Sequence, residues 1–212
     1  MIELKSIPFF VNFSDKDIKM LKDNSTLVNY NANDIVYYER DKPKYLFLLI
    51  EGGVNVYKTN SKGRQLHIHT VNPVDFLGEL AVFYKIPYHN TTECITKCKI
   101  LKIDYYKLNK NFCKDLFFCK ELVNSLNSRI TALMQVVDSS FLTTKERVAR
   151  FILKNLNEFK DSTYTDISKR LNMTPETFSR ILNDFKRKKL IDMDSEHNIT
   201  IIDKNTLLEI SE

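Results

Sequence analysis

The sequence predicts an α+β protein with a strand-rich N-terminal half, one long central helix and a helical C-terminal domain. Three observations lead to this fold class. Short runs rich in β-branched and aromatic residues, separated by turn signals, fill residues 28–103. Apolar residues change to a helical spacing over residues 105–138. Two short helix patterns and two short apolar runs follow, so we expect three parts, at residues 1–104, 105–138 and 139–212.

Length and composition are those of a globular protein. At 212 residues the chain can hold two modest domains with cores of their own, and 43% of its residues are hydrophobic and 28% charged. No apolar run is long enough to span a bilayer, and the first stretch, MIELKSIPFF, lacks the pattern of a signal peptide. We therefore expect a cytoplasmic protein without a membrane partner.

The N-terminal half begins with a helical lead-in and continues as strands. Ser14 followed by Asp17 has the spacing of a capping box, which predicts a short helix there. The runs NDIVYYE, YLFLLIEGGVNVYKT, RQLHIHTV and KCKILKI read as strands, with a hairpin at Lys62-Gly63. Several short strands at near-regular spacing are typical of a sandwich or a barrel.

The central helix carries an apolar seam with heptad spacing. Its members are Val123, Leu126, Ile130, Leu133 and Val137, at intervals of 3, 4, 3 and 4 residues. Such a seam is typical of a helix that pairs with a second helix. A core helix packed on its own strands would have the same period. Asp138-Ser139-Ser140, which follows the seam, predicts the hinge to the C-terminal domain.

Two short helices joined by a tight turn are predicted in the C-terminal domain. Thr163 with Asp166 has capping-box spacing at the start of the first, and Asn172 suits a left-handed end. Thr174 is a good N-cap and Pro175 a good first residue for the second. This arrangement predicts a helix-turn-helix, and two short strands over residues 190–202 would make it a winged variant.

The second helix of this motif has two different faces. Phe178, Ile181, Leu182 and Phe185 have the spacing of a buried stripe. The polar residues that remain are of types that contact base edges and phosphates in a major groove. We take as candidate DNA contacts Thr174, Glu176, Thr177, Ser179, Arg180, Asn183, Lys186 and Arg187. The alternative is an ordinary helical hairpin with a solvated charged face.

Charge is distributed unevenly along the C-terminal part. The whole chain has a formal charge of +5, yet residues 143–189 hold twelve Lys and Arg against six Asp and Glu. Residues 190–212 hold one against six. A basic region centred on a helix-turn-helix is the pattern expected of a surface that faces phosphates.

The stretch TPETFSRILNDFKRKKLI resembles the recognition helix of the CRP/FNR superfamily, which are bacterial dimeric transcription regulators. Within it, Glu176, Ser179 and Arg180 are similar to the E-x-x-S-R triad of the FNR-type branch. The resemblance implies a homodimer that binds double-stranded DNA at an inverted repeat of TTGAT half-sites, with Arg180 on the guanine. It also implies that residues 105–138 form a dimerisation helix, and that RNA polymerase is a further partner.

The strand-rich half resembles the β-roll sensor domain of cyclic-nucleotide-binding proteins, at Gly52-Gly53, at Gly63 and over residues 76–81 (FLGELA). The resemblance implies an effector pocket, whose candidate residues are Gly78, Glu79, Leu80, His89 and Asn90. In cyclic-nucleotide binders the Glu contacts the ribose and a following Arg clamps the phosphate. Glu79 is present, but no Arg occurs from residue 65 to residue 128. A buried phosphate without a cation is poorly matched, so cAMP is not expected.

Two other cofactors, an iron–sulfur cluster and haem, are known in this superfamily. FNR-type oxygen sensors hold an iron–sulfur cluster on cysteines near the N-terminus, whereas here the cysteines are Cys94, Cys98, Cys113 and Cys119, with spacings unlike those of a ferredoxin. A cluster is therefore not expected, and reduced thiols are. His67 and His69 are two apart on a strand, should face the same way, and are candidate ligands of a haem that senses nitric oxide.

The signal itself is left open by the sequence. Nitric oxide through haem, a redox signal at the cysteines, another small ligand, or no ligand are all compatible with it. No nucleophile–base pair, phosphate-binding loop or metal-ligand spacing occurs, so an enzyme is not expected. A cyclic-nucleotide-responsive regulatory subunit, or a small-molecule binding module that does not act on DNA, are the alternatives to a DNA-binding regulator.

Overall fold

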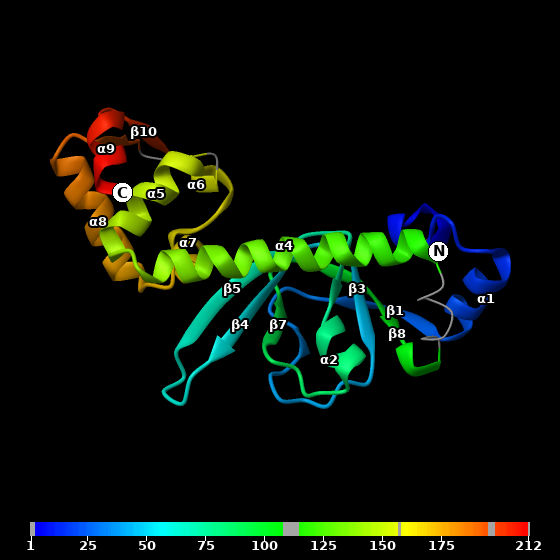
Figure 1. Cartoon of the computed structure of the whole chain (residues 1–212). Helices are drawn as coiled ribbons and strands as arrows, with labels where there is room; N and C mark the ends of the chain where they lie inside the picture. Colours follow the sequence, from blue (N-terminus) through cyan, green and yellow to red (C-terminus); the bar gives the residue numbers. More distant parts are fainter. Residues whose placement is uncertain (1–2, 108–114, 157, 195–197, 212) are drawn as a thin grey trace. The chain divides into compact units, whose positions relative to one another are not determined.

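A computed structural model describes residues 3–107, 115–156, 158–194 and 198–211 of the chain (Figure 1). It divides into two compact units, Met1–Leu133 and Met134–Glu212. The first unit begins with two short 3-10 turns, Leu4–Ser6 and Pro8–Phe10, and helix α1, Asp15–Asp23. The Ser14 side chain accepts a hydrogen bond from the Asp17 N–H, as its capping-box spacing predicted.

Eight strands form two four-stranded antiparallel sheets in the first unit. One sheet has the order β1 (Ser25–Tyr30), β8 (Cys98–Ile103), β3 (Leu46–Glu51) and β6 (Asp75–Leu77). The other has the order β2 (Ile35–Tyr37), β7 (Thr91–Cys94), β4 (Val54–Thr59) and β5 (Gln65–Val71). The β4–β5 hairpin turns at Lys62-Gly63, as predicted. Chain neighbours such as β3 and β4 lie in different sheets, so the two sheets roll around one core.

That core holds the side chains that alternate inward from both sheets. Leu49, Val54 and Ile100 are fully buried in it. Helix α2 (Glu79–Tyr84) follows β6 directly, and Gly78 joins the two with a φ of +71°. A Cβ at Gly78 would lie 2.5 Å from the ring of Tyr88, so both the backbone angle and the space require glycine there.

Helix α4 (Leu116–Ser140) is the longest helix among the described residues. Its first turns are anchored to the first unit by Phe118, which is buried among the rings of Phe9, Phe13 and Phe76. The helix continues through Asp138-Ser139-Ser140, where the sequence predicted a hinge. The helical conformation thus extends two residues past the boundary predicted at residue 138, and both serines donate their hydroxyls to helix carbonyls three residues back. The chain leaves the helix at Phe141 and Leu142 instead.

The second unit is a small helical domain with a two-stranded wing. Its elements are α5 (Thr144–Lys154), α6 (Glu158–Asp161), α7 (Tyr164–Arg170), α8 (Pro175–Arg187), β9 (Ile191–Met193), β10 (Ile199–Ile201) and α9 (Lys204–Ser211). Strands β9 and β10 pair antiparallel, with Ile191 opposite Ile201. Residues 195–197, between the two strands predicted over residues 190–202, lie outside the described residues. The α+β fold class, with a β-roll, a long helix and a winged helix-turn-helix, is confirmed.

No helix in the described ranges is both long and apolar enough to cross a membrane.

Candidate DNA-binding surface and effector cavity

Local backbone chemistry positions helix α8. Asn172 takes a left-handed conformation, with a φ of +53°, and ends α7. Thr174 then caps α8, because its hydroxyl accepts a hydrogen bond from the Thr177 N–H at 3.2 Å, and Pro175 occupies the first helical position. The helix-turn-helix predicted from these residues is therefore present, and its tight turn fixes where the second helix begins.

The two faces of α8 separate as the sequence predicted. Phe178, Ile181, Leu182 and Phe185 are buried in the core of the second unit. Glu176, Arg180 and Asn183 are exposed, and Ser179 is half-buried beside them. The apolar and polar residues lie on different faces of α8, so the core contacts of the apolar face direct the polar face outward.

A concave surface brings most of the candidate DNA contacts together. Its lining includes Glu176, Ser179, Arg180, Asn183 and Arg187. Backbone N–H bonding at the helix start, and then the Thr174 side chain, hold the pKa of Glu176 below its usual range, so its carboxylate is an ionised acceptor.

Three of the predicted contacts lie outside this lining. Thr174 and Thr177 bond to one another in the helix cap, with 3.1 Å between their hydroxyl oxygens. The Lys186 ammonium donates to the Met193 carbonyl at 3.0 Å and so is attached to the wing.

The predicted dimer seam is a continuous exposed stripe on α4. Val123, Ile130, Leu133 and Val137 are between 48% and 57% exposed, and Leu126 is half-buried. A neighbouring face of the helix contacts the β-roll through Phe118, Ser125 and Arg129. The seam is therefore not the face by which α4 packs on its own strands. This excludes the alternative that the heptad spacing marks a core helix buried against the β-roll.

The residues predicted to form an effector pocket are spread out. Glu79 is only 2% exposed, whereas Leu80 and His89 are exposed. The Asn90 side chain accepts a hydrogen bond from the Tyr37 hydroxyl at 3.4 Å. Gly78 is covered by the ring of Tyr88. None of these residues lines the cavity of the first unit that lies beside Arg129.

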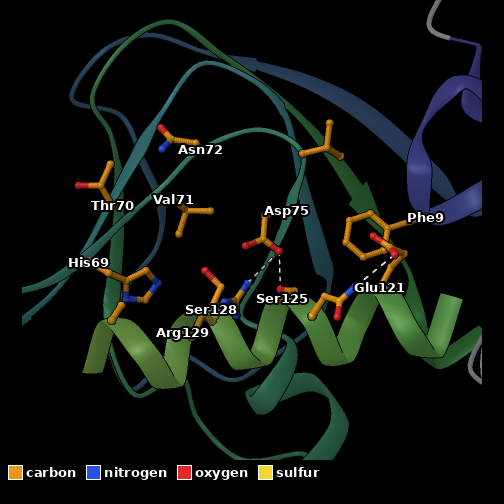
Figure 2. Close-up of a pocket in the computed structure, with 13 residues that line it drawn as sticks. Phe9, His69, Thr70, Val71, Asn72, Asp75, Glu121, Ser125, Ser128 and Arg129 are labelled. Carbon is orange, nitrogen blue, oxygen red and sulfur yellow. Dashed lines mark hydrogen bonds and ion pairs between the residues drawn. The ribbon is translucent and has the colours of Figure 1, made fainter. Parts of the chain in front are cut away.

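That cavity lies between the end of β5, the start of β6 and one face of α4, and has a volume of about 330 Å³ (Figure 2). This volume is at the low end of the range of roughly 300–1,000 Å³ for small-molecule sites. The polar side chains that line it include His69, Asp75, Ser128 and Arg129. Figure 2 shows them projecting from the β-roll and from α4 toward the same space.

Arg129 is the central charged group here, and sequence reasoning missed it. Its guanidinium donates to a Glu79 carboxylate oxygen and to the Phe76 carbonyl, and lies 3.6 Å from Asp75. Burial acts to lower the pKa of Arg129, but the carboxylates of Glu79 and Asp75 outweigh it, so that the pKa is raised. The Ser125 hydroxyl also donates to Asp75. These contacts fasten α4 to β6 and to the first residue of α2.

The two candidate haem ligands do not face the same way. A bulge in β5 pairs His69 with Val56 but His67 with Tyr57, so one residue is skipped between them. Cross-strand partners share a face, and Val56 and Tyr57 face opposite sides, which separates the two imidazoles. The Nε2 atom of His67 accordingly lies 3.2 Å from the hydroxyl of Thr70. The expected common direction is therefore wrong.

His69 alone reaches the cavity. Burial, and then the charge of Arg129, lower its pKa from 6.5 to about 4, and its Nδ1 atom is buried without a hydrogen-bond partner. A neutral imidazole can ligate a metal, but a small cavity lined by two carboxylates and one committed Arg does not fit a haem with its two propionates. The cavity therefore does not support the prediction that His69 ligates a haem.

The three cysteines in the described part of the chain do not belong to a cluster of metal ligands. Cys94 and Cys98 are buried, Cys119 is half-buried, and Cys113 lies outside the described residues. Burial raises the pKa of the Cys94 thiol, and the Cys98 thiol donates to the Gly53 carbonyl at 3.3 Å. Among the residues that the structure describes, no group of three or more His, Cys, Asp or Glu side chains could hold a metal ion.

Comparison with known families assigns both units. Residues 27–113 match the model of the cyclic nucleotide-binding domain, and residues 146–210 match that of the Crp-like helix-turn-helix domain. The chain belongs to the CRP/FNR family of transcription regulators. It is a member with a DNA-binding helix-turn-helix, as its recognition-helix motif indicated.

Several members of the CRP/FNR family resemble this chain along most of its length. The cAMP-activated global transcriptional regulator Vfr of Pseudomonas aeruginosa is 26% identical over 158 residues, which is 72% of this chain and 73% of Vfr. The HTH-type transcriptional regulator ArcR of Staphylococcus haemolyticus is 26% identical over 204 residues, covering 88% and 87%. A putative crp/fnr regulator from Eubacterium rectale has the same fold, with a TM-score of 0.74, 17% identity and coverage of 97% and 98%.

Replacing Arg129 with Met should destabilise the first unit of this family member. The Glu79 carboxylate would stay buried without its cation, which costs about 3–5 kcal/mol of unfolding free energy in such sites. Urea unfolding followed by tyrosine fluorescence measures this. Lys99→Met is the matched control, since Lys99 pairs with Glu51 at 2.8 Å on the surface and should cost at most about 1 kcal/mol. Equal losses in the two variants would contradict the assignment.

His69 should make stability depend on pH. Its pKa is lowered from 6.5 to about 4, so between these values the unfolded chain binds a proton that the folded chain does not. The free energy of unfolding should therefore fall as pH falls through this window, by about 3 kcal/mol in total. In His69→Gln that part of the dependence should vanish in urea melts at a series of pH values. His89→Gln, which removes an exposed imidazole, serves as the control, and parallel curves for wild type and His69→Gln would refute the assignment.

Proposed function

We propose that two copies of this DNA-binding transcription regulator pair through the α4 seam and read an inverted repeat of TTGAT half-sites. The observation that carries the proposal is the outward presentation of Glu176, Ser179 and Arg180 on the exposed side of α8. Because the target is double-stranded DNA, we place the protein in the cytoplasm, with RNA polymerase as a further partner implied by the family.

Each reading residue has a role that its chemistry supports. Arg180 is exposed, and its planar guanidinium can donate two hydrogen bonds to the O6 and N7 atoms of guanine. Glu176 is held ionised in the first turn of α8, where it can accept from the N4 amine of cytosine. Ser179 can donate or accept at a neighbouring base pair. The positive end of the helix dipole lies at the same turn and favours approach of the phosphate backbone.

The exposed seam supports pairing of two chains. A stripe of apolar residues at heptad spacing, largely open to solvent in one chain, is typical of a helix that forms a coiled coil with a second copy. A two-fold dimer presents two identical α8 helices, and these can enter successive major grooves when they lie about 34 Å apart. An inverted repeat of half-sites matches that symmetry.

We further propose that a small effector acts at the cavity beside Arg129. An occupant there would touch both the β-roll and α4, so it could favour one orientation of the dimerisation helix over another. Vfr is named for activation by cAMP. In this chain Asp75 and Glu121 line the cavity with Arg129, and Arg129 is already paired with Glu79. A cyclic phosphate would therefore meet more negative than positive charge, which favours an effector other than a cyclic nucleotide.

Arg180→Ala should lose sequence discrimination more than affinity. Without its guanidinium, binding to the TTGAT repeat should weaken by about 1–3 kcal/mol per half-site. The loss should be confined to duplexes that carry guanine at the position assigned to Arg180. Fluorescence anisotropy with duplexes that carry each base at that position measures this. Lys186→Gln is the control, because removal of a phosphate contact should weaken binding to every duplex alike and lower the salt dependence. A uniform loss in Arg180→Ala would refute the assigned role.

A further inference from the structure

Asp184 on helix α8 is surrounded by cations. Its carboxylate lies 3.0 Å from the Lys145 ammonium, 2.7 Å from the Arg187 guanidinium and 3.3 Å from the Lys188 ammonium. The Asp184 side chain is 24% exposed, whereas that of Arg187 is 79% exposed. One carboxylate therefore engages three cations of the basic region.

Both Asp184 and Lys145 occupy positions that their own helices disfavour. Asp184 lies in the last turn of α8, where the negative end of the helix dipole repels an anion. Lys145 lies in the first turn of α5, where the positive end of that helix's dipole repels a cation. Their pairing offsets both. The Lys145 ammonium, followed by the Arg187 guanidinium, lowers the pKa of Asp184 to about 2, so the carboxylate stays charged at any pH suited to DNA binding.

The same carboxylate lines the concave surface that holds the base-reading residues. Asp184 is one helical turn after Arg180, and Arg187 and Lys145 line the surface with it. A phosphate that approaches these cations therefore meets a carboxylate already bonded to them. Each phosphate contact made by Lys145, Arg187 or Lys188 must replace an existing ion pair rather than add to free charge.

We propose that Asp184 determines specificity by suppressing non-specific binding to DNA. It holds Lys145, Arg187 and Lys188 in ion pairs, which weak and misplaced phosphate contacts do not break. When Arg180 and Glu176 dock on their bases, the phosphates are held where the exchange of partners is favourable. This inference rests on the proposed reading of a TTGAT repeat by α8.

The test compares the wild type with Asp184→Asn, which keeps the size of the side chain and removes its charge. Binding is measured by anisotropy on the TTGAT inverted repeat and on an unrelated duplex, between 50 and 200 mM salt. The variant should bind the unrelated duplex more tightly, and its salt slope should steepen by about 0.9 for each phosphate contact regained. That corresponds to an additional loss of about 3.5-fold over this salt range per contact. The ratio of specific to non-specific affinity should fall at least about threefold.

Two further variants separate this role from general effects. Asp15→Asn makes the same change in charge by removing the partner of Lys5, 2.6 Å away in the first unit, and should leave both duplex affinities unchanged. Asp184→Asn with Lys145→Gln restores the local charge and should return the salt slope toward that of the wild type. If Asp184 only joined α5 to α8, the double variant would unfold more readily with no change in slope.

An Asp184→Asn protein that melts like the wild type and keeps its slope and its ratio overturns the inference. Asp184→Ala decides by the same criteria if the amide disturbs folding. A wild type that binds both duplexes equally would instead refute the proposed function, and the inference with it.

Discussion

The burial of one side of helix α8 is the constraint on which the rest of the account depends. Phe178 and Phe185 are fully enclosed by the core of the second unit, and they lie two turns apart on the same face. A helix fixed at two such points cannot rotate without exposing a large apolar ring, which costs about 1.5–3 kcal/mol per side chain. The outward direction of Glu176, Ser179 and Arg180 is thus enforced by the core, before any contact with DNA.

Helix α4, like α8, has one face that packs on its own unit and one face that is exposed. One face is attached to the β-roll by the ring of Phe118 and by the ion pairs of Arg129, and the other presents an apolar seam. A buried charge pair is sensitive to its surroundings, because any group that enters the cavity alters the solvation of Arg129, Asp75 and His69. In the proposed function, an effector in this cavity would therefore act on the same helix that carries the apolar seam.

Local signals predicted most of the architecture, and non-local contacts account for what they missed. Capping residues such as Ser14, Thr163 and Thr174 marked helix starts, since their bonds span only three residues. Arg129 pairs with Glu79 across fifty positions, so no local pattern revealed it, although its spacing from Phe118 and Ser125 places it on their face. The bulge that turns His67 away from His69 could not be predicted from the alternation of side chains along a strand. It is set by the pairing of β4 with β5. The ion pairs of Asp184 could be predicted from the sequence only in part. Arg187 and Lys188 follow it within one helical turn, whereas Lys145 lies on another helix.

The most direct test of the central claim uses the wild-type protein and the geometry of its target. Binding stoichiometry and affinity are measured on a duplex with two inverted TTGAT half-sites one helical turn apart, and on the same duplex lengthened by about five base pairs, half a turn. Two outward-facing α8 helices held by one dimer predict two chains per duplex and a large loss of affinity on the lengthened site. One chain per duplex, or equal affinity for the two duplexes, would contradict the account.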